Sequence, residues 1–176
     1  MKIMFFLKKT YYYILKRINH TVYAKKCGVN FKEGTVFFYG NTEWGSEPWL
    51  ITLGENVYLT DGVKFITHDG GTLLYRHIIP DLEITKPIKI GNDVYVGNDV
   101  IFLPGVTVGN NVVIGAGAIV TKDIPDNSLV VGVPARRIKS ADDYFEKLKN
   151  ESIHLGHLKG KEKEIALKNY FGYKSK

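Results

Sequence analysis

The chain has 176 residues, of which 44% are hydrophobic and 24% charged, and this predicts one soluble globular domain with short extensions. Its single cysteine, Cys27, excludes an internal disulfide and fits a reducing compartment, so we expect a cytoplasmic protein. The formal net charge is +6, and much of the excess lies near the two ends of the chain. A nucleic-acid-binding face, which needs basic residues interleaved with aromatic ones, is therefore not expected.

The first element expected is an amphipathic helix over residues 1–24. Apolar residues recur there at helical spacing, namely Leu7, Tyr11, Ile14, Leu15 and Ile18. Lys8 and Lys9 interrupt the apolar run too early for a signal peptide or a membrane span. Two roles stay open: the helix covers an end of the neighbouring fold or packs between subunits, or residues 1–20 make a peripheral contact with an anionic membrane.

From residue 90 onward, apolar residues recur every six positions in two interleaved sets. The first set is Ile90, Val96, Phe102, Val108, Ile114 and Val120, and the second is Val94, Val100, Val106, Val112, Ala118 and Ile124. Helices repeat their apolar positions every 3.6 residues and strands every 2, so alternating gaps of four and two indicate short strands separated by corners. Three six-residue units would make one coil of a triangular prism filled with aliphatic side chains.

The same six-residue register begins earlier, at Leu53 and Leu59, and breaks after His68. Residues 69–87 interrupt it, and a loop of this length inside a compact domain is usually functional. Glycines and asparagines at the corners, Asn111 among them, are expected to supply backbone shapes that other residues resist. After Pro134, residues 140–176 predict a helical tail, with helices over about 141–150 and 162–171.

This repeat, with the closing segment VTKDIPDNSLVVGVPARRI from Val120 to Ile138, resembles the hexapeptide-repeat acyltransferases. The resemblance implies an all-β solenoid, a left-handed parallel β-helix over residues 25–139 with helical extensions at both ends, assembled as a homotrimer. The segment GSEPWLITLGENVYLTDGVKFITHDGG is most similar to sugar O-acetyltransferases of surface-polysaccharide pathways. That similarity implies acetyl-CoA as the donor and a sugar hydroxyl as the acceptor.

Among the five histidines, His68 has the most suggestive position, at the last regular point before the long loop. Acetyl transfer to a hydroxyl needs a base, and imidazole, with an unperturbed pKa of about 6.5, suits that task near neutral pH. The family places its catalytic histidine at this point, so the resemblance implies that His68 is the general base. The alternative is a corner histidine bonded to backbone. Well-known relatives have proline next, whereas this chain has Asp69, which either orients the imidazole or caps the loop turn.

Besides Asp69, four further residues are candidates for binding the acceptor. Glu47, from the preceding coil, is placed to orient His68 or to hold a sugar hydroxyl, and Asn41 is a candidate for a sugar contact. Trp44 and Trp49 are expected either to stack on a sugar face or to close the core of the first coil.

Six residues fall on the family's acetyl-CoA contacts. The resemblance implies that Asn98 lies near the thioester, that Ala116, Thr121 and Lys122 follow the cofactor, and that Arg136 and Lys139 hold the adenosine phosphates. Taken singly, each cation is more often a solvated surface charge. No metal is expected: carbonic anhydrases of this fold bind zinc through three coil histidines, which this chain lacks.

Two other functions remain open. The first is N-acetylation of an amino sugar, in which a deprotonated amine needs little help from a base. The second is an inactive solenoid scaffold, for which we expect no binding of acetyl-CoA.

Overall fold

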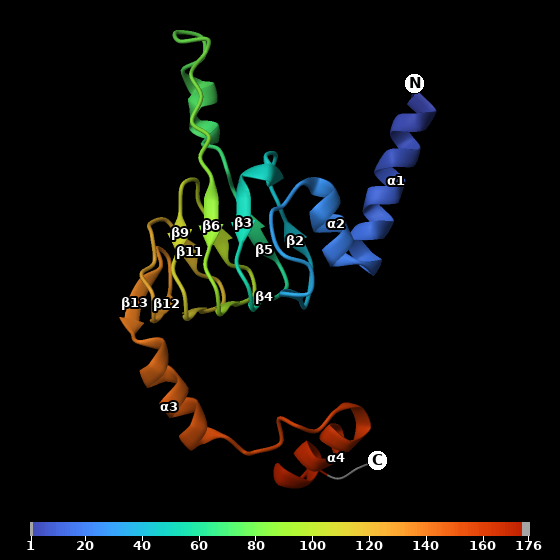
Figure 1. The fold of residues 1–176 in the computed structure, drawn as a ribbon, viewed down its shortest axis with the longest axis vertical. Coiled ribbons are helices and arrows are strands. Elements are labelled where there is room, and N and C mark those ends of the chain that lie inside the picture. The colour runs from blue at the N-terminus through green and yellow to red at the C-terminus, as the bar shows by residue number, and fades with distance from the viewer. Residues whose placement is uncertain (1, 174–176) are drawn as a thin grey trace. The chain divides into compact units, whose positions relative to one another are not determined.

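The computed structural model describes residues 2–173, with side chains described for residues 10–173. The chain divides into two compact units, Met1–Ala141 and Asp142–Lys176 (Figure 1). The first unit contains two α-helices followed by three sheets of short strands, and the second contains most of the helical tail.

The N-terminal segment forms two helices where one had been expected over residues 1–24. Helix α1 spans Lys2–Ile18 and helix α2 spans His20–Cys27. Asn19 causes the break, because its backbone leaves the helical region and its side-chain Oδ1 accepts a hydrogen bond from Val22 N at 2.9 Å. The side chains of Leu7, Lys8 and Lys9, on which part of the amphipathic pattern depends, lie outside the side chains that the structure describes.

Short strands follow in rotation around three sheets. In chain order they are β1 (Val36–Phe38), β2 (Thr42–Glu43), β3 (Ile51–Leu53), β4 (Val57–Leu59), β5 (Val63–Phe65), β6 (Ile88–Ile90), β7 (Val94–Val96), β8 (Ile101–Phe102), β9 (Thr107–Val108), β10 (Val112–Ile114), β11 (Ile119–Val120), β12 (Ser128–Val131) and β13 (Arg136–Lys139). The sheets have the orders β1-β4-β7-β10-β12-β13, β11-β8-β5-β2 and β3-β6-β9. Every pairing is parallel except that of β12 with β13.

The six-residue repeat determines the register between coils. Val94 pairs with Val112 and Phe102 with Val120, so residues three repeat units apart lie side by side in one sheet. All twelve residues of the two apolar sets are buried, as predicted. They point between the three sheets and form one continuous core, which burial of apolar surface stabilises.

The corners use asparagine and glycine in two ways, of which only the backbone angles were expected. Asn111 has a positive φ of 53°, but Asn92 and Asn110 act through their side chains: each Oδ1 accepts a backbone N–H of the preceding coil at 2.8 Å. Gly91 is required by close approach, since a Cβ there would lie 2.5 Å from Gly109 O. The corners therefore combine left-handed backbone angles, which also occur at Gly62, Gly105 and Gly117, with side-chain contacts between coils.

The long loop leaves the coils between β5 and β6 and returns to the point it left. Its neck is closed by hydrogen bonds from Lys86 N to Thr67 O at 2.8 Å and from Asp69 N to Ile84 O at 2.9 Å. Beyond the neck the loop contains the 3-10 helix η2 (Gly70–Leu74) and extends away from the sheets as a narrow arm (Figure 1). Another 3-10 helix, η1 (Pro48–Leu50), precedes β3.

The second unit holds helix α3 (Ala141–Glu151), which begins at its boundary, and helix α4 (Gly160–Tyr170). Their bounds lie close to the predicted ranges of 141–150 and 162–171. Within the described residues, no helix has the length and apolar character needed to cross a membrane.

Candidate active site

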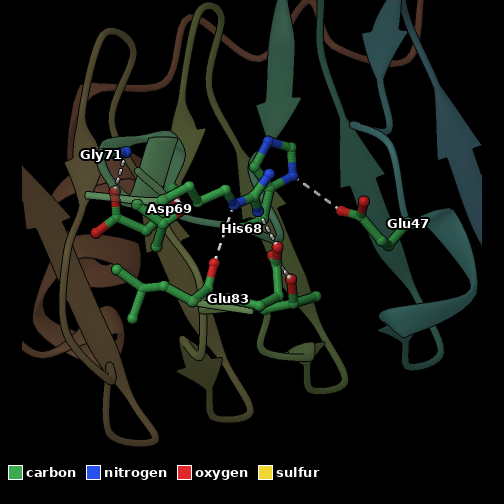
Figure 2. A network of polar contacts seen from close by, with 9 residues as sticks. Glu47, His68, Asp69, Gly71 and Glu83 are labelled. Atoms are coloured by element: carbon green, nitrogen blue, oxygen red, sulfur yellow. Dashed lines mark hydrogen bonds and ion pairs between the residues drawn. The ribbon is translucent and has the colours of Figure 1, made fainter. Parts of the chain in front are cut away.

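His68 lies at the neck of the long loop, where the chain passes from β5 towards β6. Its Nδ1 is 3.0 Å from Oε2 of Glu47, which comes from the segment just after β2 in the preceding coil. Figure 2 shows the two side chains pointing towards each other. The imidazole is 38% exposed and the Glu47 side chain 23% exposed, so the pair is accessible from solvent but partly enclosed.

A second hydrogen bond fixes the Glu47 carboxylate. The hydroxyl of Thr67, a fully buried residue, donates to the same Oε2 at 2.5 Å. The hydrogen bonds from Thr67 and then from His68 hold the pKa of Glu47 below its usual range. Because an ionised carboxylate only accepts, His68 presents Nδ1–H to it, and the lone pair of Nε2 is left for an incoming molecule.

Asp69 has a different role from its neighbour. Its Oδ1 accepts a hydrogen bond from Gly71 N at 2.8 Å and so caps the start of η2 (Figure 2). Of the two alternatives from the sequence, the loop cap is therefore the one observed. The carboxylate that contacts the imidazole is that of Glu47.

A cavity of about 280 Å³ opens beside the imidazole. It is lined by Ser46, Glu47, His68, Asp69, Gly70, Thr72, Leu73, Arg76 and Glu83. Arg76 forms an ion pair with Glu83 and also donates from Nε to Leu82 O at 3.0 Å, so its charge is balanced within the loop. The cavity thus has an imidazole at one wall and several hydrogen-bonding groups at the others.

Eight of the predicted site residues fall on two corners of the sheet that contains β2, β5, β8 and β11. We call the corner before these strands the entry corner and the corner after them the exit corner. The entry corner carries Asn41, Asn98 and Ala116, and the exit corner carries Glu47, His68, Asp69, Thr121 and Lys122. Within one chain, the sheet separates the two groups.

At the entry corner, both asparagines take part in contacts between coils. Asn98 Oδ1 accepts from Asp61 N at 3.2 Å, and Asn41 N donates to Asp61 Oδ1 at 2.7 Å. Asn98 also lines an open cavity of about 670 Å³ with Tyr39, Tyr58, Thr60, Asp61 and Tyr95. The single chain therefore brings neither asparagine to His68.

The expected contact between Trp44 and a sugar requires correction. Its indole is 4% exposed and lies in the core, stacked on Phe65 at 5.2 Å between ring centroids. Phe65 in turn stacks on Phe102 at 4.8 Å. A ring enclosed in this column has no face to offer a sugar, so Trp44 closes the core of the first coil. Trp49, in contrast, is exposed.

A third cavity, of about 320 Å³, lies at the last coils. Its lining combines the cations Lys122, Arg136 and Arg137 with Asp123, Ile124, Pro125, Val130 and Ala135. Arg137 is already engaged, because it donates from Nε to Ser128 Oγ at 3.1 Å. Lys139 lies further along β13, opposite Leu129, and is not part of this lining. Mixed cationic and apolar walls suit a ligand with phosphates and an aromatic base.

Several residues of the site were not predicted from the sequence, among them Thr67 and Arg76. Thr67, which fixes Glu47, belongs to neither apolar set of the repeat, and only its position beside His68 could have marked it. Arg76 lies within the long loop, where no periodic pattern indicates which side chains return towards the coils.

The thiol of Cys27 and clusters of metal-ligating side chains are the other possible sources of chemistry in this chain. Burial raises the pKa of the Cys27 thiol, which favours its protonated, unreactive form. In the described part of the chain, no group of three or more His, Cys, Asp and Glu residues is arranged to hold a metal ion.

Comparison with known proteins identifies related chains. The family model described as bacterial transferase hexapeptide (six repeats) matches residues 87–122. Protein CapG of Staphylococcus aureus is 42% identical over 166 residues, which are 94% of this chain and 96% of CapG. Galactoside O-acetyltransferase of Escherichia coli (strain K12) is 37% identical over 131 residues, 71% of this chain and 64% of that protein.

The solved structures similar to this chain include sugar acetyltransferases as well. A maltose O-acetyltransferase from Clostridium difficile 630 superposes with a TM-score of 0.53 at 28% identity, covering 74% of this chain and 84% of that one. A galactoside acetyltransferase in complex with coenzyme A superposes with a TM-score of 0.52 at 29% identity, covering 78% of this chain and 80% of the other.

Proposed function

Since this chain belongs to the bacterial hexapeptide-repeat transferases and is an acetyltransferase that uses acetyl-CoA, we propose that it acetylates a hydroxyl group of a sugar. The observation that carries this proposal is the contact between His68 and Glu47 beside an open cavity. A hydroxyl needs a base when it attacks a thioester, and this pair supplies one. The relatives named as galactoside and maltose O-acetyltransferases support a sugar acceptor.

In the proposed reaction, Nε2 of His68 takes the proton of the sugar hydroxyl as its oxygen attacks the thioester carbon. An ester C–O bond forms, the C–S bond breaks, and the proton passes to the departing coenzyme A thiolate. The Glu47 carboxylate acts as a positioning group, because it fixes the ring and stabilises the imidazolium that forms. The acceptor hydroxyl would occupy the cavity that His68 and Glu47 line.

The donor is proposed to lie along the last coils. Lys122 and Arg136 line one cavity together with apolar side chains, which fits the phosphates and the adenine of acetyl-CoA. Thr121, next to Lys122, and Lys139, further along β13, would extend this contact surface. Ala116 leaves room at the entry corner for the pantetheine arm.

The distribution of the site residues supports an assembly in which two copies of the chain complete one site. Asn41, Asn98 and Ala116 lie at the entry corner, away from His68 at the exit corner of the same sheet. We therefore propose a left-handed β-helix that assembles as a homotrimer, in which the entry corner of one copy faces the exit corner of the next. Exposed apolar residues of the loop would pack in this assembly: Leu73, Leu74, Tyr75, Ile78 and Ile79. Light scattering at micromolar protein should give three times the mass of one chain.

An acceptor panel tests the proposal. We propose a cytoplasmic enzyme that works on sugars of surface-polysaccharide biosynthesis, so the panel holds neutral sugars, amino sugars and their nucleotide-linked forms. Acetyl-CoA should be consumed in the presence of sugars that lack an amine. The product should carry an acetyl ester, which mild alkali hydrolyses. An alkali-stable amide formed only with amino sugars would assign N-acetylation, and no consumption with any acceptor would favour a scaffold.

A further inference from the structure

The net positive charge of this chain comes from its first 32 residues. They contain eight of the 24 Lys and Arg residues, while all 18 Asp and Glu residues come later, the first being Glu33. The remainder of the chain is therefore slightly acidic, and the net positive charge belongs to the segment that contains α1 and α2. A segment with cations and no carboxylates is complementary to a polyanionic surface.

Helix α1 uses one side to pack against α2. Leu15 is buried, and Tyr12 meets Tyr23 edge to face, with 6.2 Å between the ring centroids. The Tyr12 hydroxyl also donates to Lys26 O at 3.4 Å. These contacts fix which side of α1 faces the rest of the first unit.

Another stripe of α1 has no cover in the described part of the chain. Tyr11, Ile14 and Ile18 follow the i, i+3, i+7 spacing that places residues on one helix face. They are 47%, 49% and 74% exposed, respectively. Exposed apolar side chains aligned in this way form a patch that a binding partner can cover, which would remove their apolar surface from water.

Cations flank this stripe. Lys26 of α2 lies over the Tyr11 ring at 5.5 Å from its centroid, and Arg17 lies over the Tyr13 ring at 4.7 Å. Both cations belong to exposed residues, so they are free to meet headgroups. An apolar stripe with cations at its sides is the arrangement of helices that lie in the interface of an anionic bilayer.

We infer that α1 docks this protein on an anionic lipid bilayer, with Tyr11, Ile14 and Ile18 entering the headgroup layer and the cations Arg17 and Lys26 meeting lipid phosphates. Pairing the same face of two copies would place cations against cations, which electrostatic repulsion opposes. An anionic bilayer suits both the cations and the apolar stripe, because it offers negative charge and an apolar interior. The inference does not depend on the chemistry at His68.

Co-sedimentation of the full chain with vesicles tests this inference. Phosphatidylcholine vesicles are compared with vesicles containing about 30% phosphatidylglycerol, at low and high salt. The chain should pellet with the anionic vesicles at low salt, and each cation removed should lower binding about fivefold. Lys26→Glu and Arg17→Glu test the charges, while Ile14→Asp with Ile18→Asp tests the stripe and should lower binding by about tenfold or more.

Phe145→Asp with Leu148→Asp in α3 is the matched control, because it places the same two charges on other exposed apolar residues and should leave vesicle binding unchanged. Acetyl transfer without vesicles should be unaffected in every variant, which separates this inference from the proposed function. Equal binding to both vesicle types, no binding by the parent chain, or full binding by the Ile14/Ile18 variant would overturn the inference. A lower oligomeric mass of that variant, with no vesicle binding by the parent chain, would assign the stripe to an interface between copies.

Discussion

Glu47 and His68 are 21 positions apart in the chain, yet Oε2 of one lies 3.0 Å from Nδ1 of the other. They meet because β2 and β5 pair in one parallel sheet, so the corners that follow these strands stack on each other. A carboxylate from one coil thereby orients an imidazole from the next, and a third group, the Thr67 hydroxyl, orients the carboxylate.

Replacing the base should abolish most of the activity. We expect His68→Ala to lower kcat by about 10²–10⁴-fold, because that is the usual contribution of general acid–base catalysis. Acetyl-CoA binding measured by calorimetry should not change. His77→Ala is the control, since that ring contacts Leu74 O within the loop and should be dispensable. Turnover of His68→Ala within about threefold of the parent enzyme would be incompatible with the base mechanism.

Glu47→Gln keeps the shape of the side chain but removes its charge. We expect kcat to fall by about tenfold, because a hydrogen bond to a charged group is worth about 1 kcal/mol more than a neutral one. The KM for acetyl-CoA should stay the same, since Glu47 lies at the acceptor cavity. Glu55→Gln, at an exposed ion pair with Lys32, is the control and should leave both constants unchanged. A change confined to KM would instead indicate that Glu47 binds the acceptor.

The lowered pKa of Glu47 has a consequence for acid stability. In the unfolded chain this carboxyl titrates near pH 4.3, and in the folded protein it titrates lower, so its ionised form stabilises the fold above the unfolded pKa. That contribution is lost as pH falls through the folded pKa. In urea unfolding, the parent enzyme should exceed Glu47→Gln in stability at pH 7, and the difference should shrink below about pH 4. Thr67→Val, which removes the largest cause of the shift, should show a weaker pH dependence than the parent. A difference that stays constant with pH would contradict this assignment.

The cations at the last coils should act through binding alone. We expect Lys122→Glu to raise the KM for acetyl-CoA by about tenfold or more, with little change in the KM for the acceptor. The parent enzyme should also lose affinity for acetyl-CoA at high salt, because exposed ion pairs are screened. Lys161→Glu, an exposed lysine of α4, is the control. Unchanged acetyl-CoA binding by Lys122→Glu would move the proposed donor site away from these coils.

Gly91 and Gly70 give a matched test of the stacking. A Cβ at Gly91 would lie 2.5 Å from Gly109 O, whereas a Cβ at Gly70 would meet nothing within 4 Å. We expect Gly91→Ala to lower the free energy of unfolding by about 1–3 kcal/mol, as overpacking does. Gly70→Ala should lie within about 0.5 kcal/mol of the parent protein. Thermal unfolding measures both, and equal midpoints would show that the corner can widen without cost.

The coils were predictable from sequence because their pattern is local. A six-residue period allows one arrangement of inward-facing residues, and all twelve of the predicted core positions are buried. The position of His68 was equally visible, since it marks the break in that period. The break at Asn19 was missed, although asparagine is a favoured N-cap, because the apolar spacing continues across it.

Other features depend on how coils stack, and a single sequence gives little guidance there. Trp44 precedes Gly45 and Ser46 in an irregular segment. No periodic pattern there could indicate whether its side chain lies in the core or on the surface. The choice between Asp69 and Glu47 as partner of His68 also depended on the offset between β2 and β5. Adjacent residues often point apart, and here the distant carboxylate is the one that makes the contact.

The hydrogen bonds that close the neck of the long loop separate sequence changes within the loop from sequence changes within the coils. Because Thr67 and Lys86 are joined by a backbone hydrogen bond, β5 and β6 are held as if a short corner connected them. Residues between Asp69 and Ile84 can therefore be lengthened, shortened or exchanged while the coils keep their register. The wall of the proposed acceptor cavity that contains Arg76 and Glu83 belongs to this exchangeable segment, whereas His68 and Glu47 belong to the coils. If the proposed function holds, such a division lets the choice of acceptor evolve, or be engineered, by replacing one loop while the proposed catalytic pair is left in place.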